Sequence, residues 1–289
     1  MGAHPAHSRT AVTEPREPVY VCGHSARELE RLHAQGSFFQ EISRLFLHRA
    51  GLRVGMSVLD IGCGVGDLTF LAAEIVGSSG SVLGVDRWAE AVATARASAA
   101  SRGLTQVDFL EADIHQMRIS APVDALIGRF VLMHQPDPAS TLREATGHLR
   151  PGGLVVLLES HLTASVEGVH SWPHSPTYDR IMRWIVDTIR ATGAHPDMGL
   201  RLPRIFADAG LPAPKVWVQG KVEGGPDAEV YLYITESLRS MWSLARGLGV
   251  LSRPFRELDD LERELRDEVT AGGGVLTSPL IVGAWCRLP

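Results

Sequence analysis

The chain has 289 residues, of which 45% are hydrophobic and 21% are charged, a composition typical of a globular protein with a sizeable core. Its formal net charge of −5 gives no overall attraction to a phosphate backbone, so we expect no nucleic-acid partner. No stretch approaches the roughly 18 apolar residues of a membrane span, so we expect no membrane partner. Three cysteines, far apart and without a CxxC pair, indicate reduced thiols in a cytoplasmic protein.

The first elements predicted along the chain are helical. Residues 25–50 carry apolar side chains at helical spacing, and Ser25 with Glu28 matches a capping box. From residue 57 the pattern changes to short apolar runs separated by helical segments. Seven strands are predicted, at residues 57–61, 81–85, 107–112, 123–130, 154–159, 215–222 and 280–287. Such alternation is typical of an α/β fold, so we expect a Rossmann-like, mostly parallel seven-stranded sheet flanked by helices.

The predicted domain organisation is simple. Residues 1–18 lack the apolar segment of a signal peptide and are interpreted as a disordered leader, followed by a single domain over 19–289. Within that domain we expect a cofactor-binding core at 51–159 and an inserted lid at about 160–200. The lid is expected to be mobile and rich in aromatic residues, and its first part, residues 160–178, to be a loop. The remaining residues, 201–289, are expected to complete the sheet. Ligands of such folds bind at the carboxyl ends of the strands.

The strongest motif is VLDIGCGVG, residues 58–66. Glycines after a strand allow a tight turn and a close backbone approach to a ligand. A dinucleotide site of the GxGxxG type is the rival interpretation. However, Asp60 directly before the glycines suits a ligand with an ammonium and a sulfonium better than a pyrophosphate. A nicotinamide dehydrogenase is further disfavoured because neither Lys215 nor Lys221 has the tyrosine of a Tyr-x-x-x-Lys dyad.

Two more carboxylates follow the next two strands. Asp86 could accept hydrogen bonds from both ribose hydroxyls of a nucleoside, and Asp113 could accept from the adenine amine with Ile114 packed on the ring. The alternative interpretations are a turn residue for Asp86 and a helix cap for Asp113. Three such features in the right order favour a nucleoside-containing cofactor.

Residues 55–159 resemble the class I S-adenosylmethionine-dependent methyltransferases of the group that includes ubiquinone and menaquinone methyltransferases. The resemblance lies in VLDIGCGVG, GVDR, EADI, GRFVLMHQPDP and LRPGGLVVLLE. Two further segments, VYVCGHSARELERLHAQ and DMGLRLPRIFADAGL, resemble more loosely a set of bacterial small-molecule methyltransferases, many linked to natural products. The resemblance therefore implies S-adenosylmethionine as cofactor, methyl transfer as reaction and secondary metabolism as setting.

The resemblance also implies which positions hold the cofactor. Gly62 and Gly64, beside Asp60, would contact the methionine portion, and the backbone of Arg129 would contact its amino-acid moiety. Asp86 would bind the ribose, and Arg87, Asp113 and Ile114 would bind the adenine. Tyr20 would close over the cofactor.

On the acceptor side, His134 and then Glu159 are the candidates for a catalytic base, because both follow strand ends. Packing is the rival role for His134, and capping of the lid loop for Glu159. The substrate-binding residues expected are Tyr20, Trp172, His174 and Tyr178.

The histidines at 161, 170 and 174 are irregularly spaced, so no metal site is expected. We predict O-, N- or C-methylation of a small, hydrophobic or aromatic metabolite. A cyclase that keeps the cofactor as a scaffold and a non-catalytic cofactor-binding protein remain alternatives, and a homodimer is left open.

Overall fold

The computed structural model describes residues 26–251 and 258–289, and its centre is a seven-stranded sheet. The strands lie in the order β3-β2-β1-β4-β5-β10-β7. The first five are parallel to one another, and β10 runs antiparallel between β5 and β7. Their bounds are β1 Ser57–Ile61, β2 Ser81–Asp86, β3 Val107–Glu111, β4 Val123–Arg129, β5 Leu149–His161, β7 Lys215–Gln219 and β10 Leu280–Arg287. The prediction of a mostly parallel, Rossmann-like sheet of seven strands is confirmed.

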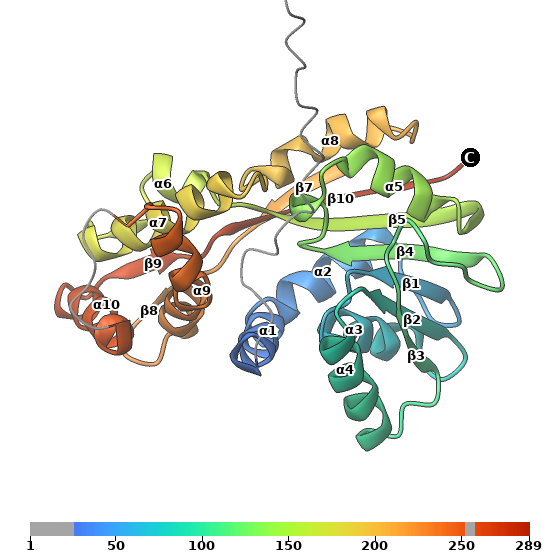
Figure 1. Ribbon diagram of the computed structural model, residues 1–289, viewed down its shortest axis with the longest axis horizontal. Coiled ribbons are helices and arrows are strands. Elements are labelled where there is room, and N and C mark those ends of the chain that lie inside the picture. Colours follow the sequence, from blue (N-terminus) through green and yellow to red (C-terminus); the bar gives the residue numbers. More distant parts are fainter. Residues whose placement is uncertain (1–25, 252–257) are drawn as a thin grey trace, which may run out of the picture.

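Helices cover both faces of this sheet (Figure 1). One face carries α5 and α8, and the other carries α2, α3 and α4, with α1 beside them. The bounds are α1 Ala26–Phe38, α2 Gln40–Ala50, α3 Asp67–Val76, α4 Ala89–Ser101, α5 Pro138–Thr146 and α8 Met198–Asp208. Because both faces are covered, the central strands are mostly apolar, and Leu59, Leu126 and Ile127 are fully buried.

The remaining elements form a cap at one end of the sheet (Figure 1). We define the cap as α6 Ala164–Glu167, β6 Ser171–Trp172, α7 Pro176–Ala191, β8 Val222–Gly224, α9 Glu229–Gly247, the 3-10 turn η2 Leu258–Asp260, α10 Leu261–Ala271 and β9 Val275–Thr277. Strands β6, β9 and β8 make a small antiparallel sheet. Two long strands join the cap to the main sheet, since β5 and β10 stay paired as far as His161 and Leu280.

The cap differs from the lid expected from the sequence. Residues 160–178, which the sequence suggested to be a loop, contain α6 and β6. The cap also includes most of residues 222–277, which were expected to complete the main sheet; that role falls to β7 and β10 alone. The cause is long-range packing, because α7 and α9 bury their apolar faces against each other, with the Trp184 and Trp242 rings 6.1 Å apart.

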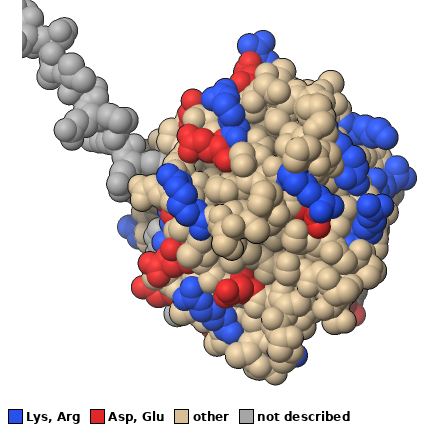
Figure 2. Space-filling model, turned by 90° about the vertical axis from the view of Figure 1, so that its right-hand side faces the viewer, with Lys and Arg blue, Asp and Glu red and all other residues tan. Residues whose placement is uncertain are grey.

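On the face drawn in Figure 2, acidic and basic side chains are interspersed. Within the described residues, we find no helix with the length and apolar character needed to cross a membrane.

Candidate functional site

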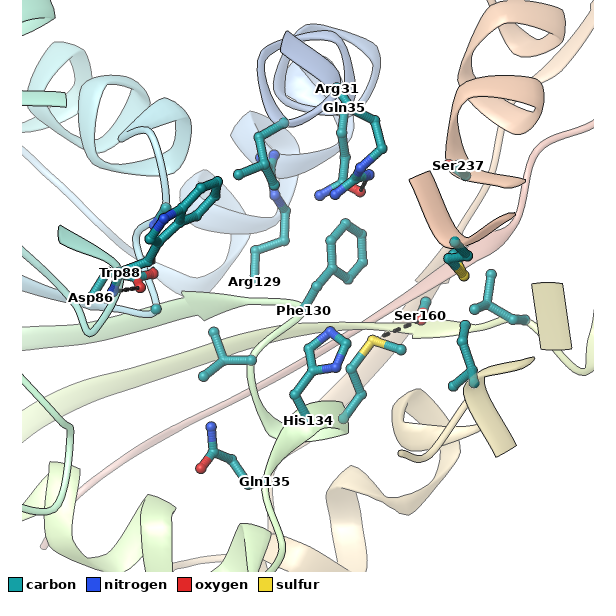
Figure 3. A pocket seen from close by; sticks show the side chains of 18 of the residues that line it. Arg31, Gln35, Asp86, Trp88, Arg129, Phe130, His134, Gln135, Ser160 and Ser237 are labelled. Atoms are coloured by element: carbon teal, nitrogen blue, oxygen red, sulfur yellow. Dashed lines mark hydrogen bonds between the residues drawn. The ribbon is translucent and has the colours of Figure 1, made fainter. Parts of the chain in front are cut away.

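A cavity of about 200 Å³ lies between the sheet, the cap and α1. It opens at the carboxyl ends of the parallel strands, beside the β1–β4 pair where the strand order reverses, which is the usual ligand position in open α/β sheets. Its walls come from the segments after β1, β2, β3 and β4, the end of β5, and helices α1, α7 and α9 (Figure 3).

The glycine motif forms one wall of this cavity. Gly62 and Gly64 both have positive φ angles, +62° and +53°. A Cβ on Gly62 would lie 2.6 Å from Cγ2 of Val131, so the close approach of this loop to the turn after β4 requires glycine. The backbone N–H of Gly64 donates to Oδ2 of Asp86 at 2.9 Å, which ties the loop to the end of β2.

Beneath this loop, Asp60 is buried in the floor of a smaller adjoining pocket of about 50 Å³. Thr69 donates to its Oδ2 at 2.6 Å, whereas Oδ1 has no hydrogen-bond partner among the described residues. Burial raises the pKa of Asp60 to about 7. The Arg129 side chain lines the same pocket and donates to Ser43 Oγ at 3.0 Å, and burial lowers its pKa. From the sequence we expected only the backbone of Arg129 to contact the ligand. The structure adds its guanidinium to the residues that line the pocket.

The carboxylates after β2 and β3 both reach the cavity. Asp86 accepts from the backbone N–H groups of Gly64 and Trp88, each at 2.9 Å. Asp113 accepts from the backbone of His115 at 2.8 Å and therefore also closes a local turn. The cavity lining contains both carboxylates together with Arg87, Trp88 and Ile114. Asp86 can thus be both a turn residue and a site residue, whereas Asp113 closes a turn and caps no helix.

The turn after β4 was not anticipated from the sequence. Phe130 has φ +58°, a strained value for a residue with a Cβ, and its ring lines the cavity (Figure 3). Glu159 stabilises this turn, because its Oε1 accepts hydrogen bonds from Val131 N at 2.9 Å and from Leu132 N at 2.7 Å. No local pattern signals the arrangement, since it depends on a side chain 28 residues away.

The two candidates for a catalytic base, His134 and Glu159, differ in whether they reach the cavity. His134, at the end of the 3-10 turn η1 (Leu132–His134), lines the cavity, and burial lowers its pKa to about 4, with Arg31 and Arg87 adding to the shift. Glu159 is fully buried and does not line the cavity, because its carboxyl group points into the β4 turn. Burial raises its pKa to about 8.

The residues expected to bind the substrate do not come together. Trp172 is 69% exposed on β6, His174 pairs with Asp179 at the surface, and Tyr178 is buried with its hydroxyl donating to Thr277 O at 2.9 Å. None of the three lines the cavity, because they lie at or before the first turn of α7 and the cavity is reached by the later turns. Tyr20 lies outside the described residues.

Other side chains take the place of these three, and they come from α1, α7 and α9. They are Arg31, Leu32 and Gln35; Met182, Ile185 and Ile189; and Tyr233, Ile234, Ser237 and Met241. The spacings 182-185-189 and 234-237-241 each follow one face of a helix, a signal present in the sequence. The sequence does not show that these two faces meet beside the glycine loop, because that contact depends on the packing of distant segments.

Known proteins resemble this chain over part of its length. A family model described as a methyltransferase domain matches residues 52–210. The trans-aconitate 2-methyltransferase of Azoarcus sp. is 36% identical over 40% of this chain and 43% of its own length. The nocamycin O-methyltransferase of Saccharothrix syringae is 29% identical over 60% and 73%. The alignments cover 31 to 64% of the length of the first five curated relatives.

Solved structures share the fold. A candidate methyltransferase of Bacillus halodurans C-125 superposes with a TM-score of 0.55 at 19% identity, over 86% of this chain and 98% of its own. The family model spans more than half of this chain, including the glycine loop, both carboxylates and the turn after β4. The chain therefore belongs to the methyltransferase domain family, as the resemblance in its motifs implied.

Proposed function

We propose that this protein transfers the methyl group of S-adenosylmethionine to a small-molecule acceptor. The observation that carries the proposal is one continuous cavity with two unlike parts. The glycine loop, Asp86 and Asp113 line one part, whereas apolar side chains of α7 and α9 line the other.

The polar part fits the cofactor group by group. Asp60 Oδ1, which has no hydrogen-bond partner in the described part of the chain, suits an ammonium, and the Arg129 guanidinium in the same pocket suits a carboxylate. Asp86 has lone pairs left for ribose hydroxyls after its two backbone contacts. Asp113 and Ile114 line the same cavity as Asp86, which supports their assignment to the adenine edge.

The chemistry demands little from the protein beyond alignment. The cofactor supplies a methyl group that is activated by its bond to a sulfonium, and the leaving group is the neutral thioether of S-adenosylhomocysteine. The chain then has to orient the acceptor and exclude water, and a base is required only if the acceptor keeps its proton. His134 lines the cavity and is the candidate to receive such a proton; burial lowers its pKa to about 4, so the imidazole is neutral at pH 7 but is a weak base.

Two alternatives from the sequence remain to be separated by experiment. A cyclase would use the same cofactor site without moving a methyl group, and a non-catalytic protein would lack an acceptor cavity. The cavity under the cap favours an enzyme over the latter.

The test uses the purified chain with methyl-labelled S-adenosylmethionine and a metabolite extract. Label transferred to an extractable product, with stoichiometric S-adenosylhomocysteine, supports the proposal. Calorimetric binding of S-adenosylhomocysteine without label transfer would favour the cyclase or the non-catalytic protein. Tight binding of NAD with no binding of S-adenosylhomocysteine would overturn the cofactor assignment.

A further inference from the structure

We infer that the acceptor is an uncharged, largely apolar molecule with a hydrogen-bond donor, selected by exclusion of charge rather than by shape. The inference rests on the proposed methyl transfer and concerns the part of the cavity under the cap. We call this part the acceptor chamber, and its apolar wall consists of Met133, Met182, Ile185, Ile189, Ile234 and Met241.

Apart from Arg31, the charged side chains of the lining belong to the other part of the cavity. Asp86 ends β2, Arg87 and Asp113 lie in the segments after β2 and β3, and Arg129 ends β4. No residue that α7 or α9 contributes to the lining is charged, among the residues the structure describes. Figure 3 shows the same separation, with Asp86 at one end of the cavity and Ser160 and Ser237 at the other.

The remaining charged group of the lining is already compensated. Arg31 donates to both carboxylate oxygens of the buried Glu28, at 2.8 and 2.7 Å, and to Gln35 at 2.8 Å. A carboxylate or phosphate in the acceptor chamber would thus lose its hydration without gaining a free counter-ion from residues 26–251 or 258–289.

Two of the polar groups that line the acceptor chamber are serine hydroxyls whose protons are engaged elsewhere. Ser237 Oγ donates to Tyr233 O at 2.7 Å, and Ser160 Oγ donates to Met133 Sδ at 3.7 Å. Both serines line the cavity and are at least 94% buried. Because the protons are used, their oxygens are left to accept, which fits an acceptor molecule that brings an O–H or N–H.

The methionines explain why shape should matter less than charge. Three of the seven methionines of the chain, Met133, Met182 and Met241, line the acceptor chamber. Methionine is unbranched and polarisable, and it adapts to differently shaped partners. The acceptor chamber should therefore accommodate neutral molecules of several shapes.

The first experiment measures ligand binding to the protein saturated with S-adenosylhomocysteine. 2-Naphthol should bind at least tenfold more tightly than the anionic 2-naphthoate and more tightly than naphthalene, which lacks the donor. 4-Phenylphenol, a neutral phenol of another shape, should bind within about tenfold of 2-naphthol. Equal binding of 2-naphthoate, or no binding of either phenol, would overturn the inference.

The second experiment places a charge in the acceptor chamber. Met241→Glu should lower 2-naphthol affinity at least tenfold and leave S-adenosylhomocysteine affinity within twofold. Leu232→Glu is the matched control, since Leu232 is 45% exposed on the same helix and should change neither affinity. If Met241→Glu does not fold, Met241→Gln tests the same wall with a neutral polar group and should lower 2-naphthol affinity severalfold.

The failures are distinguishable. If Met241→Glu or, in its place, Met241→Gln binds 2-naphthol as the unmodified protein does, the inference is wrong although the cofactor site stands. If the unmodified protein does not bind S-adenosylhomocysteine, the proposed function itself is wrong.

Discussion

At the residue scale, Asp86 connects the two halves of the proposed cofactor site, because its oxygens accept from Gly64 and from Trp88. Asp86→Ala should lower S-adenosylhomocysteine affinity at least tenfold, since each hydrogen bond to a charged group contributes about 1.5–3 kcal/mol. Titration calorimetry measures the change. Glu111→Ala is the control, because Glu111 is the in-register neighbour of Asp86 on β3 but is exposed and outside the lining. An unchanged affinity in Asp86→Ala would remove the ribose assignment.

His134 allows a prediction about the pH profile. Its pKa of about 4 means that the imidazole is neutral from pH 6 to 8, so turnover should show no titration of this group in that range. If the acceptor carries a proton, His134→Ala should lower kcat by about 10²–10⁴-fold and leave cofactor affinity within a few-fold. His174→Ala, at the exposed edge of the cap, should leave kcat unchanged. Loss of cofactor affinity at unchanged kcat would instead show a packing role for His134.

Glu159 should act through stability rather than as a base. Its pKa is about 8 in the folded chain against an ordinary value of 4.5, so between these values the unfolded chain releases a proton that the folded chain keeps. This contribution makes folding less favourable as the pH rises, by up to about 1.4 kcal/mol per pH unit. Glu159→Gln keeps an oxygen for Val131 N and Leu132 N but lacks the titration.

The variant should therefore gain stability relative to the unmodified protein between pH 5.5 and 7.5, as measured by urea unfolding. Parallel pH dependences would contradict the burial argument. A fall in kcat of a hundredfold or more in Glu159→Gln would restore the role of catalytic base.

At the scale of elements, α1 approaches α3 through a glycine. A Cβ on Gly36 would lie 2.3 Å from the carboxyl group of Asp67, the first residue of α3. Gly36→Val should therefore destabilise the protein by about 1–3 kcal/mol through overpacking, although glycine is the poorer helix former. Gly247→Ala, at the end of α9 where an added Cβ would meet no described atom within 4 Å apart from its chain neighbours and its own helix backbone, should stabilise by up to about 1 kcal/mol. Chemical denaturation distinguishes the two, and stabilisation by Gly36→Val would refute the close-packing argument.

The same contacts show which elements could be predicted from the sequence. The seven strands and the glycine loop were predicted because a buried parallel strand and a tight turn leave local patterns. The positive φ of Phe130 depends on Glu159, and the need for glycine at position 36 depends on Asp67. Such requirements arise between segments that are distant in the sequence. The packing of α7 against α9, found in place of the expected aromatic lid, is of the same kind.

At the scale of the whole molecule, the cap and α1 are attached to the sheet in different ways. The cap continues from the sheet through the paired strands β5 and β10, whose backbone ladder extends to His161 and Leu280. In contrast, α1 meets α9 through side chains, with Phe38 stacked on Tyr233 at 4.6 Å and Arg27 3.3 Å from Glu236. Opening at α1 breaks fewer backbone hydrogen bonds than opening at the cap.

This difference predicts how the cofactor enters and what it orders. Arg31, Leu32 and Gln35 of α1 line the cavity, so a bound cofactor adds contacts to this helix. In hydrogen exchange, S-adenosylhomocysteine should slow the amides of α1 by at least about tenfold, whereas α10, outside the lining, should not change. The amides of α7 should exchange slowly without any ligand, because Tyr178, Ile181 and Val186 are fully buried. Rapid exchange of α7 in the free protein would show that this segment is a mobile lid after all and would move the entrance from α1 to the cap.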